Sequence, residues 1–265
     1  KVMKFVHLSD VHLVAGGGEL NGCVPSQRLR SCLDDILQWH SDAEFCVISG
    51  DLTEFAEPRA YQLLKDMLDE FPLPYFLMMG NHDDRDVFLR IFDNYHQDPM
   101  GFIQFKHHCS AGAFIFLDTS KDGTDAHEGQ LCGARLEWLK EQLIAAEDEP
   151  VFIFTHHPPF DIGVSYVDEI KLMESEKFAL VLKYAKNLRH IFFGHVHRMT
   201  SVNWRGIPFT SPPSLNHQIP MVPESVDGEF CDEPPAYSVV NVTADQVVVH
   251  FNTFLQRNPL HQTLL

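Results

Sequence analysis

Aspartate, asparagine and histidine, side chains that bind divalent metals, recur directly after apolar segments of this sequence. The first such segment, residues 3–9, is followed by Asp10 and His12, and the second, residues 44–50, is followed by Asp51. Three more groups follow later apolar segments: Asn81, His82 and Asp83; His156 and His157; and His195 and His197. Carboxylate, amide and imidazole groups are hard or borderline ligands, so their repeated occurrence indicates a divalent-metal site.

Each of these groups on its own has an ordinary structural explanation. A lone D-x-H is typical of a turn, and a lone G-D is common at a strand end. The histidines of a lone H-x-H are more often surface residues or hydrogen-bonded core residues than metal ligands. Five groups in this order, each just after an apolar segment, favour one shared site. Two pairs, Asp10 with His12 and His195 with His197, are spaced i and i+2. Extended backbone would place both members of each pair on one face.

The elements that must position these residues alternate between strand-like and helix-like segments. Strands are expected at 3–9, 44–50, 74–80, 101–108, 113–120, 151–157 and 190–197. Helices are expected at 26–40, 58–71, 84–95, 133–146 and 174–186, with Ser26 as N-cap and Pro58 in a first turn. Four closing strands, expected to be antiparallel, follow at 199–204, 207–211, 236–242 and 246–252. This order predicts an α/β fold with a β-rich C-terminal part. In α/β sheets, ligands bind outside the carboxyl ends of the strands.

The length and the loops indicate how the chain is organised. The 265 residues suit a single domain over residues 1–265. Two segments, 158–172 and 212–235, are expected to be irregular, and the second is expected to be a lid or an interface segment. We expect these loops, together with loop 13–25, to decide which substrate is accepted.

Composition narrows the classes of partner and the compartment. A formal net charge of −17 would repel nucleic acid and anionic membrane surfaces, so neither is expected as a partner. No apolar stretch is long enough to span a bilayer, and the first residues lack the pattern of a signal peptide. The six cysteines are scattered without a C-x-x-C pair and are expected to be reduced. A cytoplasmic location is therefore expected.

The motifs D-x-H, G-D, G-N-H-D, H and G-H-x-H, in this order over residues 3–217, resemble the calcineurin-like metallophosphoesterase superfamily. Within it, the length and the stretches GNHDD, THHPP and GHVH resemble bacterial class III cyclic-nucleotide phosphodiesterases and the related glycerophosphodiesterases. The resemblance implies a four-layer α/β/β/α sandwich and two divalent metal ions, with Mn, Fe, Zn and Co all compatible with the ligands.

The resemblance also implies roles for individual residues. A first metal would be held by Asp10, His12, Asp51 and His197. A second metal would be held by Asp51, Asn81, His156 and His195. It further implies that His217, in the stretch SPPSLNHQIP, contacts the substrate. His157, as the second histidine of its pair, would lie behind the ligands or at the rim.

The chemistry expected of such a site is hydrolysis of a phosphodiester. A hydroxide held between the metals would attack phosphorus, while His82 would contact the phosphate and protonate the leaving alkoxide. Asp83 would either orient His82 or act as the N-cap of the following helix, and both interpretations stay open.

The substrate is expected to be a small glycerophosphodiester or a 3′,5′-cyclic nucleotide. Two alternatives remain, namely a phosphomonoesterase or nucleotide pyrophosphatase on the same scaffold, and a non-catalytic binding module. The resemblance also implies a homo-oligomer, a dimer or larger.

Overall fold

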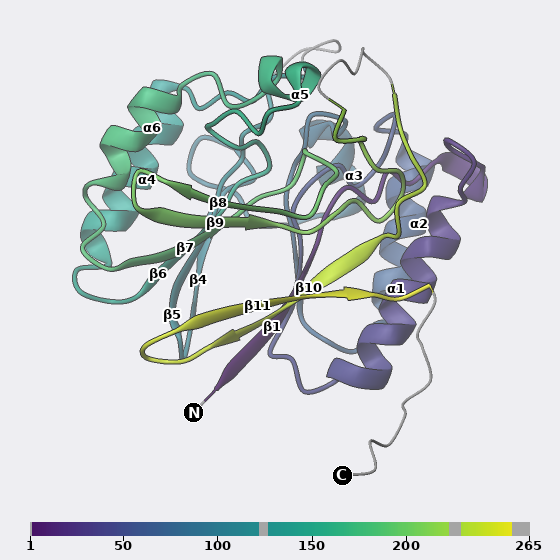
Figure 1. Ribbon diagram of the computed structural model, residues 1–265, viewed down its shortest axis with the longest axis horizontal. Coiled ribbons are helices and arrows are strands. Elements are labelled where there is room, and N and C mark those ends of the chain that lie inside the picture. The colour runs from purple at the N-terminus through teal and green to yellow at the C-terminus, as the bar shows by residue number, and fades with distance from the viewer. Residues whose placement is uncertain (1, 122–126, 223–228, 256–265) are drawn as a thin grey trace.

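Two β-sheets lie face to face, and helices cover the outer face of each sheet (Figure 1). The computed structural model describes residues 2–121, 127–222 and 229–255. Its arrangement is the four-layer α/β/β/α sandwich that the resemblance implied.

The first sheet has the strand order β11-β10-β1-β2-β3. Its strands are β1 (Met3–Leu8), β2 (Cys46–Ile48), β3 (Tyr75–Leu77), β10 (Ala236–Val242) and β11 (Val247–Thr253). Strands β1, β2 and β3 are parallel, whereas β10 is antiparallel to both β1 and β11. Three helices bury their apolar faces against this sheet: α1 (Pro25–His40), α2 (Pro58–Asp69) and α3 (Arg85–Ile91). A short 3-10 turn, η1 (Ala15–Gly17), precedes α1.

The second sheet has the strand order β4-β5-β6-β7-β9-β8. Its strands are β4 (Phe105–Cys109), β5 (Gly112–Phe116), β6 (Val151–Phe154), β7 (Leu188–Phe192), β8 (Thr200–Trp204) and β9 (Ile207–Ser211). The helices on its outer side are α4 (Gly133–Ala145), α5 (Ser165–Glu169) and α6 (Ser175–Leu182). Strands β5, β6 and β7 are parallel, so their carboxyl ends meet at one edge of the sheet.

Phenylalanine side chains fill the space between the two sheets. Phe5 of β1 lies edge-on to Phe114 of β5, with ring centroids 5.5 Å apart, and Phe154 stacks on Phe192 at 4.8 Å. All four rings are fully buried. Aromatic rings of this size contribute a large part of the buried apolar area of a core. This layer therefore fixes the two sheets, and the strand ends they carry, relative to each other.

Several expectations about individual elements were wrong. Strand β9 is parallel to β7, so the closing strands are not all antiparallel. Helix α1 begins at Pro25 with Val24 as N-cap, so Ser26 lies inside the helix, because proline suits the first helical position. Segment 158–172 contains the short helix α5 and is not wholly irregular.

Other expectations were confirmed. Pro58 begins helix α2, and all six cysteines are free thiols. In segment 212–235, the described parts are irregular apart from one bridge between Gln218 and Cys231, and residues 223–228 lie outside the described residues. Among the helices described, none combines the length and the apolar character needed to cross a bilayer.

Candidate metal centre

Four of the predicted ligands lie together where β1, β2 and β7 end. Ligand atoms of Asp10, His12, Asp51 and His197 all lie within 4.8 Å of one another, and all four residues are buried. His197 Nε2 is 3.4 Å from Asp10 Oδ1, and His12 Nε2 is 3.6 Å from Asp51 Oδ2. These are the four residues that the resemblance implied for a first metal.

The backbone brings these side chains together through left-handed residues and not through an extended strand. Five predicted ligands have positive φ: Asp10 (56°), His12 (51°), Asp51 (48°), His195 (69°) and His197 (49°). The expectation that the i, i+2 pairs converge in extended backbone was therefore wrong, although Asp10 and His12 do converge, whereas His195 and His197 belong to different clusters. Aspartate and histidine are among the residues that tolerate this region best.

Glycine is required beside Asp51 because the backbone segments approach closely. A Cβ added to Gly80 would lie 2.1 Å from Asp51 Oδ1 and 2.3 Å from the Asp51 nitrogen. A Cβ added to Gly50, which has a φ of 105°, would lie 2.4 Å from His156 Nδ1. The glycines of the G-D and G-N-H-D motifs therefore make room for the ligands.

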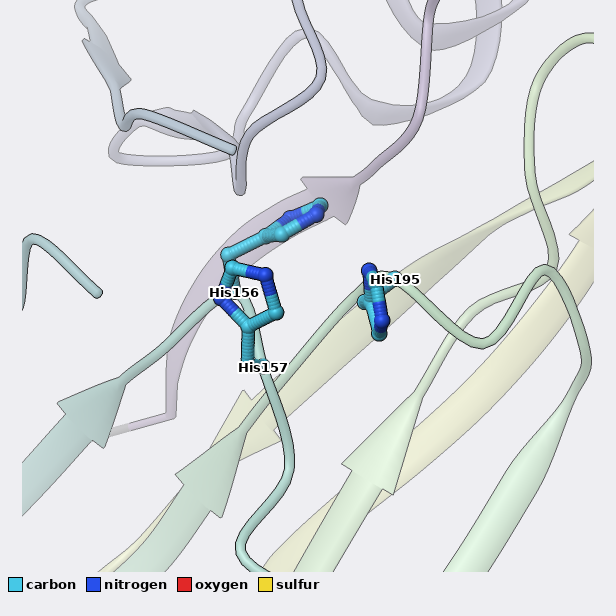
Figure 2. Close-up of side chains that lie close together, drawn as sticks. All are labelled: His156, His157 and His195. Atoms are coloured by element: carbon cyan, nitrogen blue, oxygen red, sulfur yellow. The ribbon is translucent and has the colours of Figure 1, made fainter. Parts of the chain in front are cut away.

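The predicted ligands His156 and His195 face each other, and each has one buried nitrogen without a hydrogen-bond partner in the described part of the chain, although His156 Nε2 lies 3.4 Å from Asp51 Oδ2. The rings come from the ends of β6 and β7 (Figure 2). His156 Nδ1 donates to the Ser49 carbonyl at 2.7 Å, and His195 Nδ1 donates to Asn81 Oδ1 at 2.9 Å. The Nε2 atoms of both rings are buried and have no hydrogen-bond partner among the described residues. Buried nitrogens without a hydrogen-bond partner are expected where a ligand such as a metal ion binds.

His157 completes a cluster with these two rings, but its nitrogens are already used (Figure 2). Its Nδ1 pairs with the Thr119 hydroxyl at 2.8 Å, and its Nε2 donates to the His127 carbonyl at 3.1 Å. The ring is completely buried, which lowers its pKa well below the usual value. His157 is therefore a packed neighbour of the ligands, and a position at the rim is wrong.

The protonation of the rings fits a bound cation. His12 Nδ1 donates to Glu54 at 2.7 Å and His197 Nδ1 donates to the His217 carbonyl at 2.8 Å, so the Nε2 atoms face each other at 3.1 Å. Two neutral imidazoles would oppose their lone pairs at this distance. Burial lowers the pKa of His12, whereas for His197 the Asp10 carboxylate outweighs burial and raises the pKa. The place between the two Nε2 atoms, beside the Asp10 carboxylate, therefore suits a cation.

Both central carboxylates are ionised. Burial opposes this charge, but the surrounding histidines outweigh burial and hold the pKa of Asp10 and of Asp51 below the usual value. The same attraction raises the pKa of His156 to about 9, against the opposing effect of burial. Two buried carboxylates among four imidazoles form a donor set that fits divalent metal ions.

His82 lies at the edge of this centre, held by Glu54. Its backbone N–H donates to Asp51 Oδ1 at 2.9 Å, and its Nδ1 donates to the Glu54 carbonyl at 3.0 Å. The Glu54 carboxylate is 3.7 Å from the same nitrogen. Burial disfavours charge on the ring, but Asp51 and Glu54 outweigh it and raise the pKa of His82.

Asp83 does neither of the two things expected of it. The N-cap of α3 is Asp84, whose carboxylate accepts from the Val87 N–H. The Asp83 carboxylate accepts from the backbone of Leu52, Thr53 and Gly80 and from the Tyr61 hydroxyl. It therefore joins the two loops that carry Asp51 and Asn81, while the His82 ring is held by Glu54. Burial and the Asp51 charge raise the pKa of Asp83 to about 6.

A cavity of about 270 Å³ opens above these residues. His217 lies on its wall, with its ring centroid 4.5 Å from that of His197 and 5.2 Å from that of His12. The three loops expected to select the substrate all contribute to this wall. The contributing residues are Asn21, Tyr166, Ile170, Ile219, Glu229 and Phe230.

Two residues of the site were missed at the sequence level. Glu54 accepts a hydrogen bond from His12 and, through its carbonyl, one from His82. Its position three residues after Asp51 could have indicated that it belongs to the site. His127 accepts a hydrogen bond from the Asn81 amide at 3.2 Å, and its ring lies 5.6 Å from that of His82. It follows no apolar segment, so nothing in the local sequence pointed to it.

Comparisons with known proteins agree with this site and fold. The family model described as calcineurin-like phosphoesterase matches residues 3–199. A probable cyclic nucleotide phosphodiesterase of Rhodopseudomonas palustris is 39% identical over 262 residues, which are 97% of this chain and 95% of that protein.

A glycerophosphodiester phosphodiesterase, GpdQ, of Enterobacter lignolyticus is 26% identical over 88% of this chain and 85% of that protein. Among solved structures, a dimetal phosphatase from Danio rerio has the same fold, with a TM-score of 0.73 at 16% identity over 96% of this chain and 97% of that chain. From the family match, the relatives and the fold together, we conclude that this chain belongs to the calcineurin-like phosphoesterase family.

Proposed function

We propose that the protein is a dinuclear metal-dependent phosphodiesterase that hydrolyses small phosphodiesters. The observation that carries this proposal is the donor set itself. Two buried carboxylates lie among four imidazoles whose second nitrogens are already hydrogen-bonded, so that the remaining nitrogens are available to metal ions. The family and the named phosphodiesterases among the relatives support a phosphoester as the substrate.

The seven predicted ligands divide between two metals in this proposal. The first metal would be held by Asp10, His12, Asp51 and His197. The second would be held by Asp51, Asn81, His156 and His195. When bound, two divalent ions supply Lewis-acid activation of water and neutralise charge on the phosphate oxygens. Mn, Fe, Zn and Co all suit these ligands.

The residues of the chain position the substrate and move one proton. His82 borders the cavity and, with its Nδ1 bonded to the Glu54 carbonyl, presents Nε2 as the proton donor to the leaving alkoxide. The raised pKa of His82 keeps that proton available, and a bound metal would oppose this effect. His217 and Asn81 lie on the same cavity and are proposed to contact the phosphate.

We also propose the wider setting of the enzyme. Both sheets contribute to the centre, which supports one catalytic domain. Free cysteines at all six positions support the cytoplasm as the compartment. We also propose that the protein is a homo-oligomer, a dimer or larger, and this rests only on the family resemblance.

The test compares a diester with its matching monoester. Manganese-loaded protein would be given bis(4-nitrophenyl) phosphate and 4-nitrophenyl phosphate, and Asn81→Ala would be compared with Asn203→Ala, an exposed position on β8. We expect the diester to be preferred, and Asn81→Ala alone to lower diester turnover by at least about 10-fold. A monoester preference would place the protein among the phosphatases. Protein that binds no metal on manganese loading and hydrolyses neither ester would contradict the proposal.

A further inference from the structure

Two cavities meet at His82, and the residues around them differ in kind. The smaller cavity, of about 270 Å³, is lined by five of the seven candidate metal ligands. A second cavity, of about 960 Å³, lies on the other side. Glu54, Asn81 and His82 line both, and they are the only residues shared between the two described walls. His82 therefore borders both cavities.

The smaller cavity has little room beyond the reaction centre. The phosphate group must lie there, because His12, Asp51 and His197 line this cavity and not the larger one. Its remaining wall is bulky, with Tyr166 and Phe230 among the lining residues. Once a phosphate is in place, less room is left beside it than in the larger cavity.

The larger cavity suits a bulky alcohol that carries no negative charge. Phe55 and Met100 on its wall are 65% and 48% exposed and offer apolar contact. Its arginine and lysine side chains are paired, Arg85 with Asp118 and Lys121 with Glu128. Asp84 and Asp86 add negative charge to the same wall. A second anionic group would therefore be disfavoured there.

From this division we infer that the larger cavity binds the departing alcohol of an open-chain diester, while the smaller cavity holds the substituent that stays on phosphorus. An arm that enters the larger cavity passes His82, the proposed proton donor. A cyclic diester has both ester oxygens in one ring and cannot place its two ester arms in separate cavities. The inference rests on the proposed function and narrows it to unsymmetrical open-chain diesters.

The reaction is a hydrolysis in which one particular P–O bond of the diester is always the one that breaks. The P–O bond to the larger alcohol breaks, and a P–O bond to the water oxygen forms. The larger alcohol leaves with the proton from His82, and the water supplies the proton that restores the ring. The product that remains is the phosphomonoester of the smaller alcohol.

The test uses ethyl 2-phenylethyl phosphate, whose two alcohols are similar as leaving groups but differ in size. The two phosphomonoesters are separated and quantified after partial hydrolysis by the metal-loaded protein. We expect ethyl phosphate to exceed phenylethyl phosphate by about 10-fold or more, the discrimination that a hydrophobic contact of this kind supplies. A ratio near one, or a ratio in favour of phenylethyl phosphate, would overturn the inference.

Variants of the two walls test which residues set the ratio. Met100→Trp narrows the larger cavity and Phe230→Ala widens the smaller one, so both should move the product ratio toward one. Leu180→Trp, at a 58% exposed position on α6 outside both walls, should leave the ratio unchanged. An unchanged ratio in both wall variants would contradict the assignment of the cavities.

The total turnover and the product ratio separate the two proposals. Turnover of the unsymmetrical diester with the wrong ratio would overturn the cavity assignment and leave the phosphodiesterase proposal standing. No hydrolysis of any diester would overturn both.

Discussion

Asp51 connects the parts of the candidate metal centre through its two carboxylate oxygens. Its Oδ2 lies 3.6 Å from His12 Nε2 and 3.4 Å from His156 Nε2, whereas its Oδ1 accepts from the His82 N–H. One carboxylate thus faces imidazoles from both sheets and also fixes the backbone of the proposed proton donor. A small displacement of Asp51 should therefore affect metal binding and catalysis together.

Replacing Gly80 by alanine tests this dependence. The added methyl group would lie 2.1 Å from Asp51 Oδ1, a distance at which the side chain must move. We expect Gly80→Ala to reduce bound metal and to lower diester turnover by about 100-fold, the effect of misplacing a reacting group by about 1 Å. Gly133→Ala is the matched control, because its Cβ would meet no atom within 4 Å. Equal metal content in both variants would contradict the role given to Asp51.

Glu54 is expected to act through the two histidines that it holds. Its carboxylate accepts from His12 Nδ1, which fixes the ring so that Nε2 faces the centre. We expect Glu54→Gln to lower metal affinity by about 10-fold to 100-fold, as seen when such a partner is lost. The measurement is metal content against free metal concentration, and Glu141→Gln, on the exposed face of α4, is the control. Unchanged affinity in Glu54→Gln would show that His12 needs no such support.

For individual residues, the sequence predicted which side chains gather at the candidate metal centre, but not the backbone conformation that brings them there. The first ligand set was brought together as expected because apolar segments end at the same sheet edges. The left-handed φ of Asp10 and His12 could not be predicted, since it arises from packing against loops far away in the chain. The contacts of Asp83 and Glu54 depend on the same loops.

Strand β7 shows how an element can carry buried histidines that are not ligands. His190 is buried, its Nε2 pairs with the Thr210 hydroxyl at 2.9 Å, and its ring stacks on Phe192 at 4.5 Å. Burial lowers the pKa of His190 to about 4. The ring therefore contributes to the packing between the sheets as a neutral group.

The stability of the fold should depend on pH through this residue. In the unfolded chain the pKa of His190 returns to about 6.5, so the unfolded state binds a proton that the folded state does not accept. Stability is therefore full above about pH 6.5 and falls as the pH drops toward 4. Between about pH 7 and about pH 5, we expect the loss of unfolding free energy to be about 2 kcal/mol larger in the wild type than in His190→Gln.

Urea unfolding at several pH values measures this difference. Other buried histidines, such as His157, are present in both proteins, so their contribution cancels. The charge of His190 lowers the pKa of His7, so its removal changes the profile in the same direction as the predicted difference. Parallel pH profiles in the wild type and His190→Gln would contradict the prediction.

The elements themselves were largely predictable, but their pairing was not. Apolar periodicity located the strands and helices because each must bury one face. The parallel pairing of β9 with β7 was missed, because pairing direction depends on the route of the chain between strands and not on the strand residues. Segment 158–172 has a weak pattern, and packing of Val164 and Val167 on the second sheet stabilises α5 within it.

For the whole molecule, the dominant electrostatic property is the net charge of −17. An anionic substrate would approach this protein against a repulsive field, and bound metals would reverse the field only near the site. The charge therefore slows encounter with an anionic diester.

Added salt should consequently speed up the reaction of an anionic diester at saturating metal. Raising the ionic strength from about 0.01 M to about 0.15 M shortens the Debye length from about 30 Å to about 8 Å. We expect kcat/KM for bis(4-nitrophenyl) phosphate to rise several-fold over this range. A zwitterionic diester should respond less, and a fall in kcat/KM for the anionic diester would contradict the prediction.

The left-handed backbone at five ligand positions limits how these residues could be replaced. Each such residue strains the fold by about 1–3 kcal/mol, and glycine would relieve that strain. The same side chains accept buried hydrogen bonds, such as the one from the His82 N–H to Asp51 and the one from the His195 N–H to Asp10. Removing such an acceptor leaves a buried donor without a partner, which costs about 1–3 kcal/mol. The two effects offset each other, so replacement of these ligands by glycine would bring no gain in stability.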